Sequence, residues 1–171
     1  MFADLKRDAV CWTQKIRESP AKALLVPCCI LFLSFLFRIF SGGTATFYSL
    51  LLCKGFFPGA FLYTLGHIVR MLCAGLILTG VLFCRGLFEL RLRAFACAVV
   101  TCLVLLVEYR IIFVSMSPVL ALLLCAASIA AVFLNLKFFL KSCCPGACPA
   151  LVLLLLQMIF FIQLISLCSV F

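Results

Sequence analysis

Residues 149–170 read PALVLLLLQMIFFIQLISLCSV, an apolar stretch without a charged side chain. As a helix it would cross the hydrocarbon core of a bilayer, which is roughly 30 Å thick and takes about 20 residues. The run is continuous and shows no alternation of period two, so it does not predict a strand of a closed membrane barrel. We therefore interpret it as a transmembrane helix.

Four similar runs precede it, and together they predict an all-α membrane protein. The five expected spans cover about residues 23–40, 58–84, 94–114, 118–136 and 149–170. The whole chain is 68% hydrophobic and 11% charged, whereas a soluble domain is about half apolar and about a quarter charged. With 171 residues, the chain has room for one domain, a bundle of five transmembrane helices over residues 23–171.

Residues 1–22 predict an N-terminal interfacial amphipathic helix. Apolar side chains recur at steps of three and four and form one stripe: Phe2, Leu5, Ala9, Trp12 and Ile16. Basic side chains lie off that stripe: Lys6, Arg7, Lys15 and Arg17. An apolar stripe backed by cations is typical of a helix lying on a membrane surface. Binding of an acidic protein partner is the alternative.

The distribution of charge predicts the orientation. The net charge is +9, and the basic residues fall between apolar runs, where they favour lipid headgroups rather than nucleic acid as partner. Ten of them lie in residues 1–22, 85–93 and 137–148, which share one side in a five-span topology. The other side has Lys54, joined by Arg38 if that side chain extends outward. Basic residues accumulate on the cytoplasmic side, so we expect the N-terminus inside and the C-terminus outside.

Thirteen cysteines decide little, because most lie inside apolar runs, where cysteine behaves as a small hydrophobic residue. The exception is the cluster Cys143, Cys144 and Cys148 around Pro145 and Gly146. We interpret it as a small-residue turn between two helices. A soft metal, a disulfide and acylation remain open, although no second cysteine pair or histidine accompanies it, so no metal site is predicted.

Ionisable residues inside the apolar runs are the candidate site. Arg70 lies midway along the second run, and Glu108, Tyr109 and Arg110 lie toward the outer half of the third. Tyr63 and His67 share a helical face with Arg70 because of their spacing. A charge at the bilayer centre costs at least about 2.5–3.5 kcal/mol, so these groups should face inward and pair. They form either a buried network that fixes helix register or the polar end of a ligand cavity.

The remaining polar residues point to packing rather than catalysis. Asn135, Gln157 and Gln163 predict interhelical hydrogen bonds of about 0.6 kcal/mol each. No metalloprotease, nucleophile-elbow or phosphate-loop motif is present. Catalysis by a serine and His67 would need a buried serine nearby, of which the sequence gives no sign. The sequence therefore favours a protein that is not an enzyme, without deciding the question.

The outward loop at 41–57 is apolar, and the order of its residues resembles that of a known family. Its ordered residues are Phe47-Tyr48, Leu51, Lys54-Gly55, Phe57 and Pro58-Gly59, followed by His67, Met71 and Gly75. This order resembles the tryptophan-rich sensory protein family (TspO), the bacterial relatives of the mitochondrial translocator protein. The stretches Glu108 to Phe113 and Phe138 to Ser142 extend the resemblance over about residues 24–171. The family's tryptophans are replaced here by Phe and His.

The resemblance implies a receptor or transporter-like protein that binds a planar hydrophobic ligand, either a porphyrin or other tetrapyrrole or a sterol-like molecule. It implies a pocket under the first loop, lined by Tyr48, Phe56, Phe57, His67 and Arg70, with no obligatory cofactor, although a haem-like ligand is compatible. It also implies a homodimer in a bacterial plasma membrane. The alternatives are a substrate-binding subunit of a small-solute or vitamin importer and a structural subunit of a membrane complex.

Overall fold

The computed structural model describes the backbone of residues 1–41, 60–83, 88–114, 118–142 and 144–168. Side chains are described within these segments for residues 1–36, 65–83, 91–107, 119–142 and 144–165. Within the described residues the chain is all-helical, without a strand. The helices are α1 (Phe2–Glu18), α2 (Pro20–Ser41), α4 (Ala60–Phe83), α5 (Phe88–Val114), α6 (Pro118–Ser142) and α7 (Ala147–Cys168).

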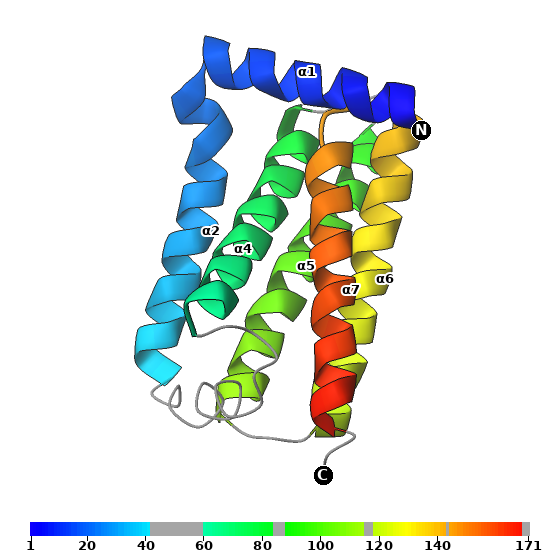
Figure 1. Cartoon of the computed structure of the whole chain (residues 1–171). Coiled ribbons are helices and arrows are strands. Elements are labelled where there is room, and N and C mark those ends of the chain that lie inside the picture. Colours follow the sequence, from blue (N-terminus) through cyan, green and yellow to red (C-terminus); the bar gives the residue numbers. More distant parts are fainter. Residues whose placement is uncertain (42–59, 84–87, 115–117, 143, 169–171) are drawn as a thin grey trace.

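Five of these helices, α2, α4, α5, α6 and α7, run lengthwise beside one another, and α1 lies across one end of them (Figure 1). The chain bends by 103° between α1 and α2. The turn from α6 to α7 lies at the end covered by α1, and the C-terminus lies at the opposite end (Figure 1). The first and last helices of the chain therefore meet at one end of the bundle.

Among the described residues, three helices are long and apolar enough to cross a membrane. They comprise Leu65–Phe83 in α4, Val119–Ser142 in α6 and Ala147–Ile165 in α7, and the bent pair α1 and α2 adds a fourth if it counts as one span. A chain with several such helices is a multi-pass membrane protein. The predicted all-α class is confirmed. The predicted count of five spans is not established by length and apolarity of the described residues.

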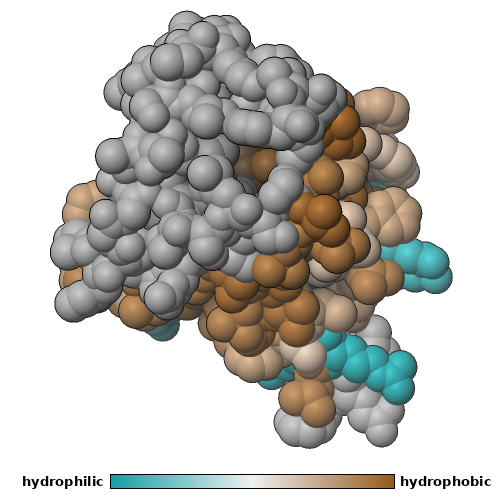
Figure 2. Space-filling model, turned by 90° about the horizontal axis from the view of Figure 1, so that it is seen from below, coloured by the Kyte–Doolittle hydropathy of each residue, from teal (hydrophilic) through white to brown (hydrophobic). Residues whose placement is uncertain are grey.

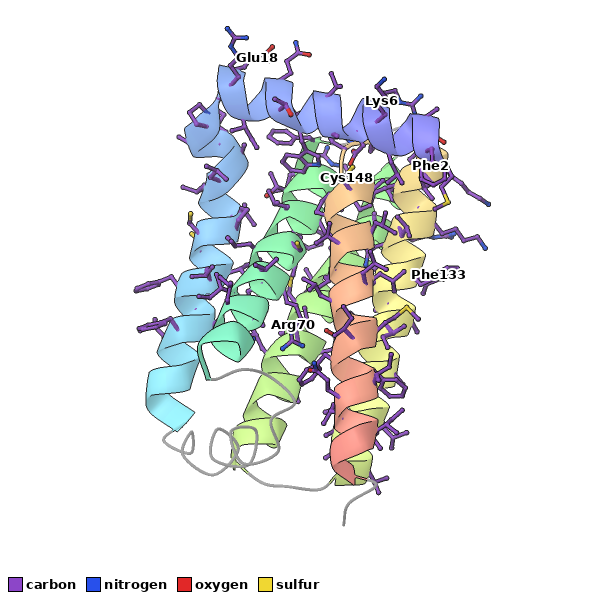
Figure 3. All side chains as sticks on the ribbon, in the orientation of Figure 1. Phe2, Lys6, Glu18, Arg70, Phe133 and Cys148 are labelled. Atoms are coloured by element: carbon purple, nitrogen blue, oxygen red, sulfur yellow. The ribbon has the colours of Figure 1, made fainter. Side chains whose placement is uncertain are left out.

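The outer surface agrees with a lipid solvent. Large apolar side chains are exposed on the helices, among them Phe32, Leu123, Phe133, Leu155 and Ile162. Phe133 projects away from the bundle (Figure 3), and hydrophobic residues cover most of the described surface seen in Figure 2. Exposure of this kind would be unfavourable in water and is expected against lipid tails.

The helices extend beyond the apolar runs at the ends nearest α1. α5 begins at Phe88 rather than near residue 94, and α6 continues to Ser142 rather than ending near residue 136. The added turns carry Arg91, Arg93, Lys137 and Lys141. A helix need not end where the hydrocarbon ends, because its backbone hydrogen bonds are internal and long basic side chains reach the headgroups.

Glycines set the closest approaches between elements. A Cβ added at Gly75 of α4 would lie 2.5 Å from Pro27 Cα of α2, and one at Gly80 would lie 2.0 Å from the Pro145 carbonyl oxygen. Both distances are shorter than van der Waals contact, so only glycine allows these backbones to pack so closely. Gly75 fixes the pairing of α2 with α4, and Gly80 fixes α4 against the turn between α6 and α7.

Candidate functional site

Among the described side chains of the lengthwise helices, Arg70 of α4 is the one charged side chain that is buried. Its side chain is 6% exposed and lies inside the bundle, in the half away from α1 (Figure 3). Its Nη1 donates a hydrogen bond to Gln157 Oε1 of α7 at 3.1 Å. Its guanidinium also lies over the ring of Phe160, 4.2 Å from the centroid, a favourable cation–π geometry.

Gln157 connects Arg70 to the next helix. Its Nε2 donates to Ser128 Oγ of α6 at 2.7 Å and lies 3.4 Å from Cys125 Sγ. Ser128 Oγ in turn donates to the Cys125 carbonyl oxygen at 2.8 Å. The amide of Gln157 is therefore fixed with its nitrogen toward α6 and its oxygen toward Arg70. This chain of hydrogen bonds joins α4, α7 and α6 across the bundle interior.

The charge of Arg70 meets no carboxylate among the described side chains, where both ion pairs involve Asp4 of α1. The predicted partner Glu108 has a described backbone in α5, but its side chain lies outside the described residues. Arg70 carries five N–H donors, and the described contacts are one hydrogen bond to a neutral amide and one aromatic ring. The site therefore presents a buried cation toward the bundle interior.

His67 lies one turn from Arg70 on α4 and contacts α2. Its Nε2 is 2.8 Å from Ser34 Oγ, and Ser34 is 4% exposed while His67 is half-buried. No buried serine was expected beside His67 from the sequence, and Ser34 corrects that expectation. Ser34 is the only hydroxyl between Lys22 and Arg38. A single polar side chain in an apolar helix usually faces another helix, and this signal could have found it.

The other predicted site residues cannot be placed. Their side chains lie outside the described residues: Tyr48, Phe56, Phe57, Tyr63, Glu108, Tyr109 and Arg110. The pocket under the first loop rests on several of them and stays a prediction. His67 and Arg70 are the two predicted site residues that the structure describes, and it places both on one face of α4, pointing into the bundle or toward α2.

A second polar contact lies between α5 and α6. Asn135 Nδ2 donates to Thr101 Oγ1 at 3.1 Å and to the Ala131 carbonyl oxygen at 2.9 Å. Its Oδ1 is buried, and no described group donates to it. The predicted interhelical hydrogen bonds of Asn135 and Gln157 are thus confirmed. Gln163 is buried in α7.

At the other end of the bundle, α1 contributes a buried carboxylate that the sequence analysis did not single out. Asp8 is 6% exposed. It accepts hydrogen bonds from the backbone N–H groups of Gly146 and Cys148, each at 2.7 Å. These groups lie at the first turn of α7, where a helix leaves N–H donors without partners and favours a negative charge. Asp8 therefore caps α7 from a different helix.

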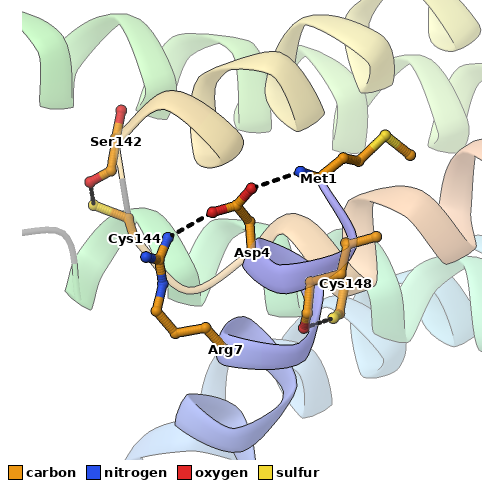
Figure 4. Close-up of polar contacts among 7 residues, drawn as sticks. Met1, Asp4, Arg7, Ser142, Cys144 and Cys148 are labelled. Atoms are coloured by element: carbon orange, nitrogen blue, oxygen red, sulfur yellow. Dashed lines mark hydrogen bonds and ion pairs between the residues drawn. The ribbon is translucent and has the colours of Figure 1, made fainter.

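Two cysteines of the predicted cluster, Cys144 and Cys148, lie close to the start of α1 (Figure 4), and Cys143 lies outside the described residues. Cys148 Sγ donates to the Leu5 carbonyl oxygen at 3.1 Å, and Cys144 is disulfide-bonded. Within the described part of the chain, no group of three or more metal-ligating side chains gathers. The small-residue turn is confirmed between α6 and α7, and of the open alternatives the disulfide is the one present at Cys144. A cavity of about 130 Å³ separates Asp4, Arg7 and Cys11 from this turn.

Asp4 anchors the start of α1. Its carboxylate lies 2.8 Å from the Met1 ammonium and 3.2 Å from Arg7 Nη2 (Figure 4). The hydrogen bond and the charge of that ammonium hold the pKa of Asp4 below its usual value. The predicted apolar stripe of α1 divides: Leu5 and Trp12 pack toward the bundle, with Trp12 edge-on to Phe83 of α4 at 6.4 Å, while Phe2 is 86% exposed.

Comparison with known proteins finds no family model, curated protein or solved structure that matches this chain. The resemblance to the tryptophan-rich sensory protein family is therefore neither supported nor opposed by these comparisons. The function has to be argued from the buried groups themselves.

Proposed function

We propose that this chain is an integral membrane protein of five spans that binds a hydrophobic ligand carrying an anionic group, with Arg70 as the anion-binding residue. The observation that carries the proposal is the burial of Arg70 at 6% exposure with a neutral amide and an aromatic ring as its contacts. Neither contact neutralises the charge, so the site favours an anion.

The energetics of a buried charge support this choice. An ionised group away from water is unfavourable unless it is paired, and a guanidinium takes a carboxylate or phosphate in a bidentate geometry. In the low-dielectric interior such a pair is stronger than in water. Ionisable residues inside membrane spans are also candidates for substrate sites by default. Arg70 would supply the charge and the aromatic Phe160 an apolar surface beside it.

The resemblance supplies the finer proposal. A planar ligand with a carboxylate, such as a porphyrin, would stack on aromatic side chains while Arg70 binds its propionate. Phe47, Tyr48, Phe56 and Phe57 belong to the loop that would cover this ligand, and a homodimer is the expected assembly. The proposed topology has the N-terminus in the cytoplasm and the C-terminus outside, supported by the accumulation of basic residues on the side of residues 1–22.

A structural role is the second candidate. The chain of hydrogen bonds from Arg70 through Gln157 to Ser128 joins three helices, as expected of a network that fixes helix packing in a subunit of a larger membrane complex. An importer subunit is a third possibility, but no described contact favours it over the others.

Titration of the detergent-purified chain with protoporphyrin, followed by quenching of Trp12 fluorescence, tests the proposal. The uncharged dimethyl ester serves as the comparison ligand. Arg70→Met should weaken protoporphyrin binding by about 10- to 150-fold, the equivalent of roughly 1.5–3 kcal/mol for a charged hydrogen bond. Binding of the dimethyl ester should change little.

The matched control is Arg93→Met, because Arg93 is an exposed arginine on α5 and its loss should leave both affinities unchanged. If Arg70→Met binds each ligand with the same affinity as the wild-type chain, Arg70 does not belong to the binding site. If Arg70→Met loses its cooperative thermal transition while the wild-type chain binds neither ligand, the network is structural.

A further inference from the structure

Ser34 and His67 come together because of how α2 packs on α4. The two helices approach most closely where Pro27 meets Gly75. Seven residues further along α2 is Ser34, and eight residues back along the antiparallel α4 is His67. With a rise of 1.5 Å per residue, both steps cover nearly the same distance, so the two side chains reach the same level. Their Oγ–Nε2 distance is 2.8 Å.

Ser34 differs from the other buried hydroxyls of the described chain. Thr79 Oγ1 donates to the Gly75 carbonyl oxygen at 2.9 Å, and Thr101 and Ser128 likewise bond to carbonyls of their own helices at 2.8 Å. Such bonds are the usual way in which a hydroxyl is satisfied inside a helix. The described hydrogen bond of Ser34 instead joins it to an imidazole on another helix.

We propose that Ser34 and His67 are a nucleophile and a general base that cleave acyl esters dissolved in the membrane. A serine hydroxyl becomes a useful nucleophile when a base stands within about 2.6–3.2 Å of it. With the proton of neutral His67 on Nδ1, its Nε2 accepts the Ser34 hydroxyl proton. This activity stands on its own geometry and does not depend on a ligand at Arg70.

The reaction has two steps. Ser34 Oγ attacks the ester carbonyl carbon and forms a C–O bond, while its proton passes to His67 Nε2. The ester C–O bond then breaks, and the leaving alkoxide takes that proton and departs as an alcohol. In the second step water attacks the acyl-Ser34 with His67 again accepting the proton, and Ser34 regains it as the carboxylic acid leaves. Water is the sole co-reactant.

The surroundings define the substrate class. Neighbours of Ser34 on α2, Phe32, Leu33 and Phe35, are each more than half exposed on the outer surface of the bundle, where lipid tails would lie. Ser34 is 4% exposed and His67 is half-buried, so the imidazole is the more accessible member of the pair. A substrate must bring its carbonyl to this apolar level, which suits a long-chain acyl ester and excludes a polar water-soluble one.

An alkyl fluorophosphonate with a long chain tests the pair in the full-length chain in detergent. Ser34 Oγ should displace fluoride and form a stable P–O bond, located by mass spectrometry of the peptides. Ser128 is the internal control, because it is also buried but hydrogen-bonded to an amide and a carbonyl instead of an imidazole. We expect an adduct on Ser34 and none on Ser128 in the same molecules.

Variants assign the role of the base. His67→Gln should slow labelling of Ser34 by about 100-fold, the lower range for a general base. Thr79→Ala, which removes a hydroxyl bonded to its own helix on α4, should leave labelling of Ser34 at the wild-type rate. Ser34→Ala should abolish both the adduct and the hydrolysis of a long-chain p-nitrophenyl ester. Absence of an adduct on wild-type Ser34, while an added serine hydrolase reacts in the same detergent, would overturn the proposal. Equal labelling of Ser34 and Ser128 would do so as well, even if the variants fail to fold.

Discussion

Asp8 and Arg70 are charged side chains buried to the same extent, 6% exposed each, and their surroundings differ. Asp8 accepts two backbone hydrogen bonds of 2.7 Å at the positive end of α7. Arg70 has one hydrogen bond of 3.1 Å to a neutral amide and an aromatic ring. The first charge is accommodated by two hydrogen bonds from the fold, and the second meets no carboxylate among the described side chains. The extent of burial therefore does not distinguish a structural charge from a functional one. The groups that contact the charge do distinguish them.

Removal of the Asp8 carboxylate should have the largest effect on stability. Asp8→Ala leaves two buried N–H groups without acceptors, and charged hydrogen bonds contribute about 1.5–3 kcal/mol each. We expect a loss of roughly 3 kcal/mol in the free energy of unfolding, measured by thermal or denaturant unfolding in detergent. The control is Asp4→Ala, which removes two surface ion pairs on the same helix and should destabilise far less, because exposed ion pairs contribute little. Similar losses for both variants would mean that Asp8 does not cap α7.

The close packing of α4 against the turn between α6 and α7, at the same end of the bundle as Asp8, can be tested with glycine substitutions. Gly80→Ala would place a Cβ against the Pro145 carbonyl oxygen, and overpacking of this kind costs about 1–3 kcal/mol. Gly66→Ala on the same helix meets nothing within 4 Å and should be neutral or stabilising by up to about 1 kcal/mol. If the two variants have the same melting temperature, α4 does not pack closely against the turn between α6 and α7.

A smaller effect is expected when Arg70 is given an internal counter-ion. Gln157→Glu keeps the size of the side chain and places a carboxylate beside the guanidinium. It should raise the stability of the ligand-free protein by about 1 kcal/mol, since an ion pair replaces a hydrogen bond from the guanidinium to a neutral amide. It should also weaken the binding of protoporphyrin, because the new carboxylate competes for Arg70. Gln163→Glu, a change of the same kind in the same helix, serves as control. If Gln157→Glu binds protoporphyrin as tightly as the wild-type chain, the anionic group of the ligand does not bind at Arg70. Arg70 would then be a structural charge, as Asp8 is.

The sequence predicts the helices well and their contacts less well. A continuous apolar run specifies a helix because lipid leaves the backbone no other partner than itself, and the runs at 118–136 and 149–170 become α6 and α7. Helix ends are shifted outward where basic residues continue a helix past the hydrocarbon, as at Arg91 and Lys141. Neither shift is visible in hydrophobicity, because the added turns are polar.

The candidate site is predictable only in part. Arg70 and His67 stand out because a charged or ionisable residue in an apolar run must face inward, and Asn135 and Gln157 follow the same logic. Ser34 carries a weaker signal, as the single hydroxyl of its apolar run, and that signal does not say which helix it faces. Asp8 does not stand out, because its partners lie 138 and 140 residues away and no local pattern connects them. The register between distant helices is set by Gly75 and Gly80, whose roles appear only in three dimensions.

The cap of α7 also imposes an order of events on biosynthesis. Asp8 is synthesised before the amides it binds, the first of which follows 138 residues later. At about 5–20 residues per second, its carboxylate waits roughly 7–28 s for them. Throughout this interval α1 has no α7 to cover, and we expect it to stay at the hydrated surface while the lengthwise helices enter the bilayer one after another. Docking of α1 would then follow the arrival of α7 in the bilayer.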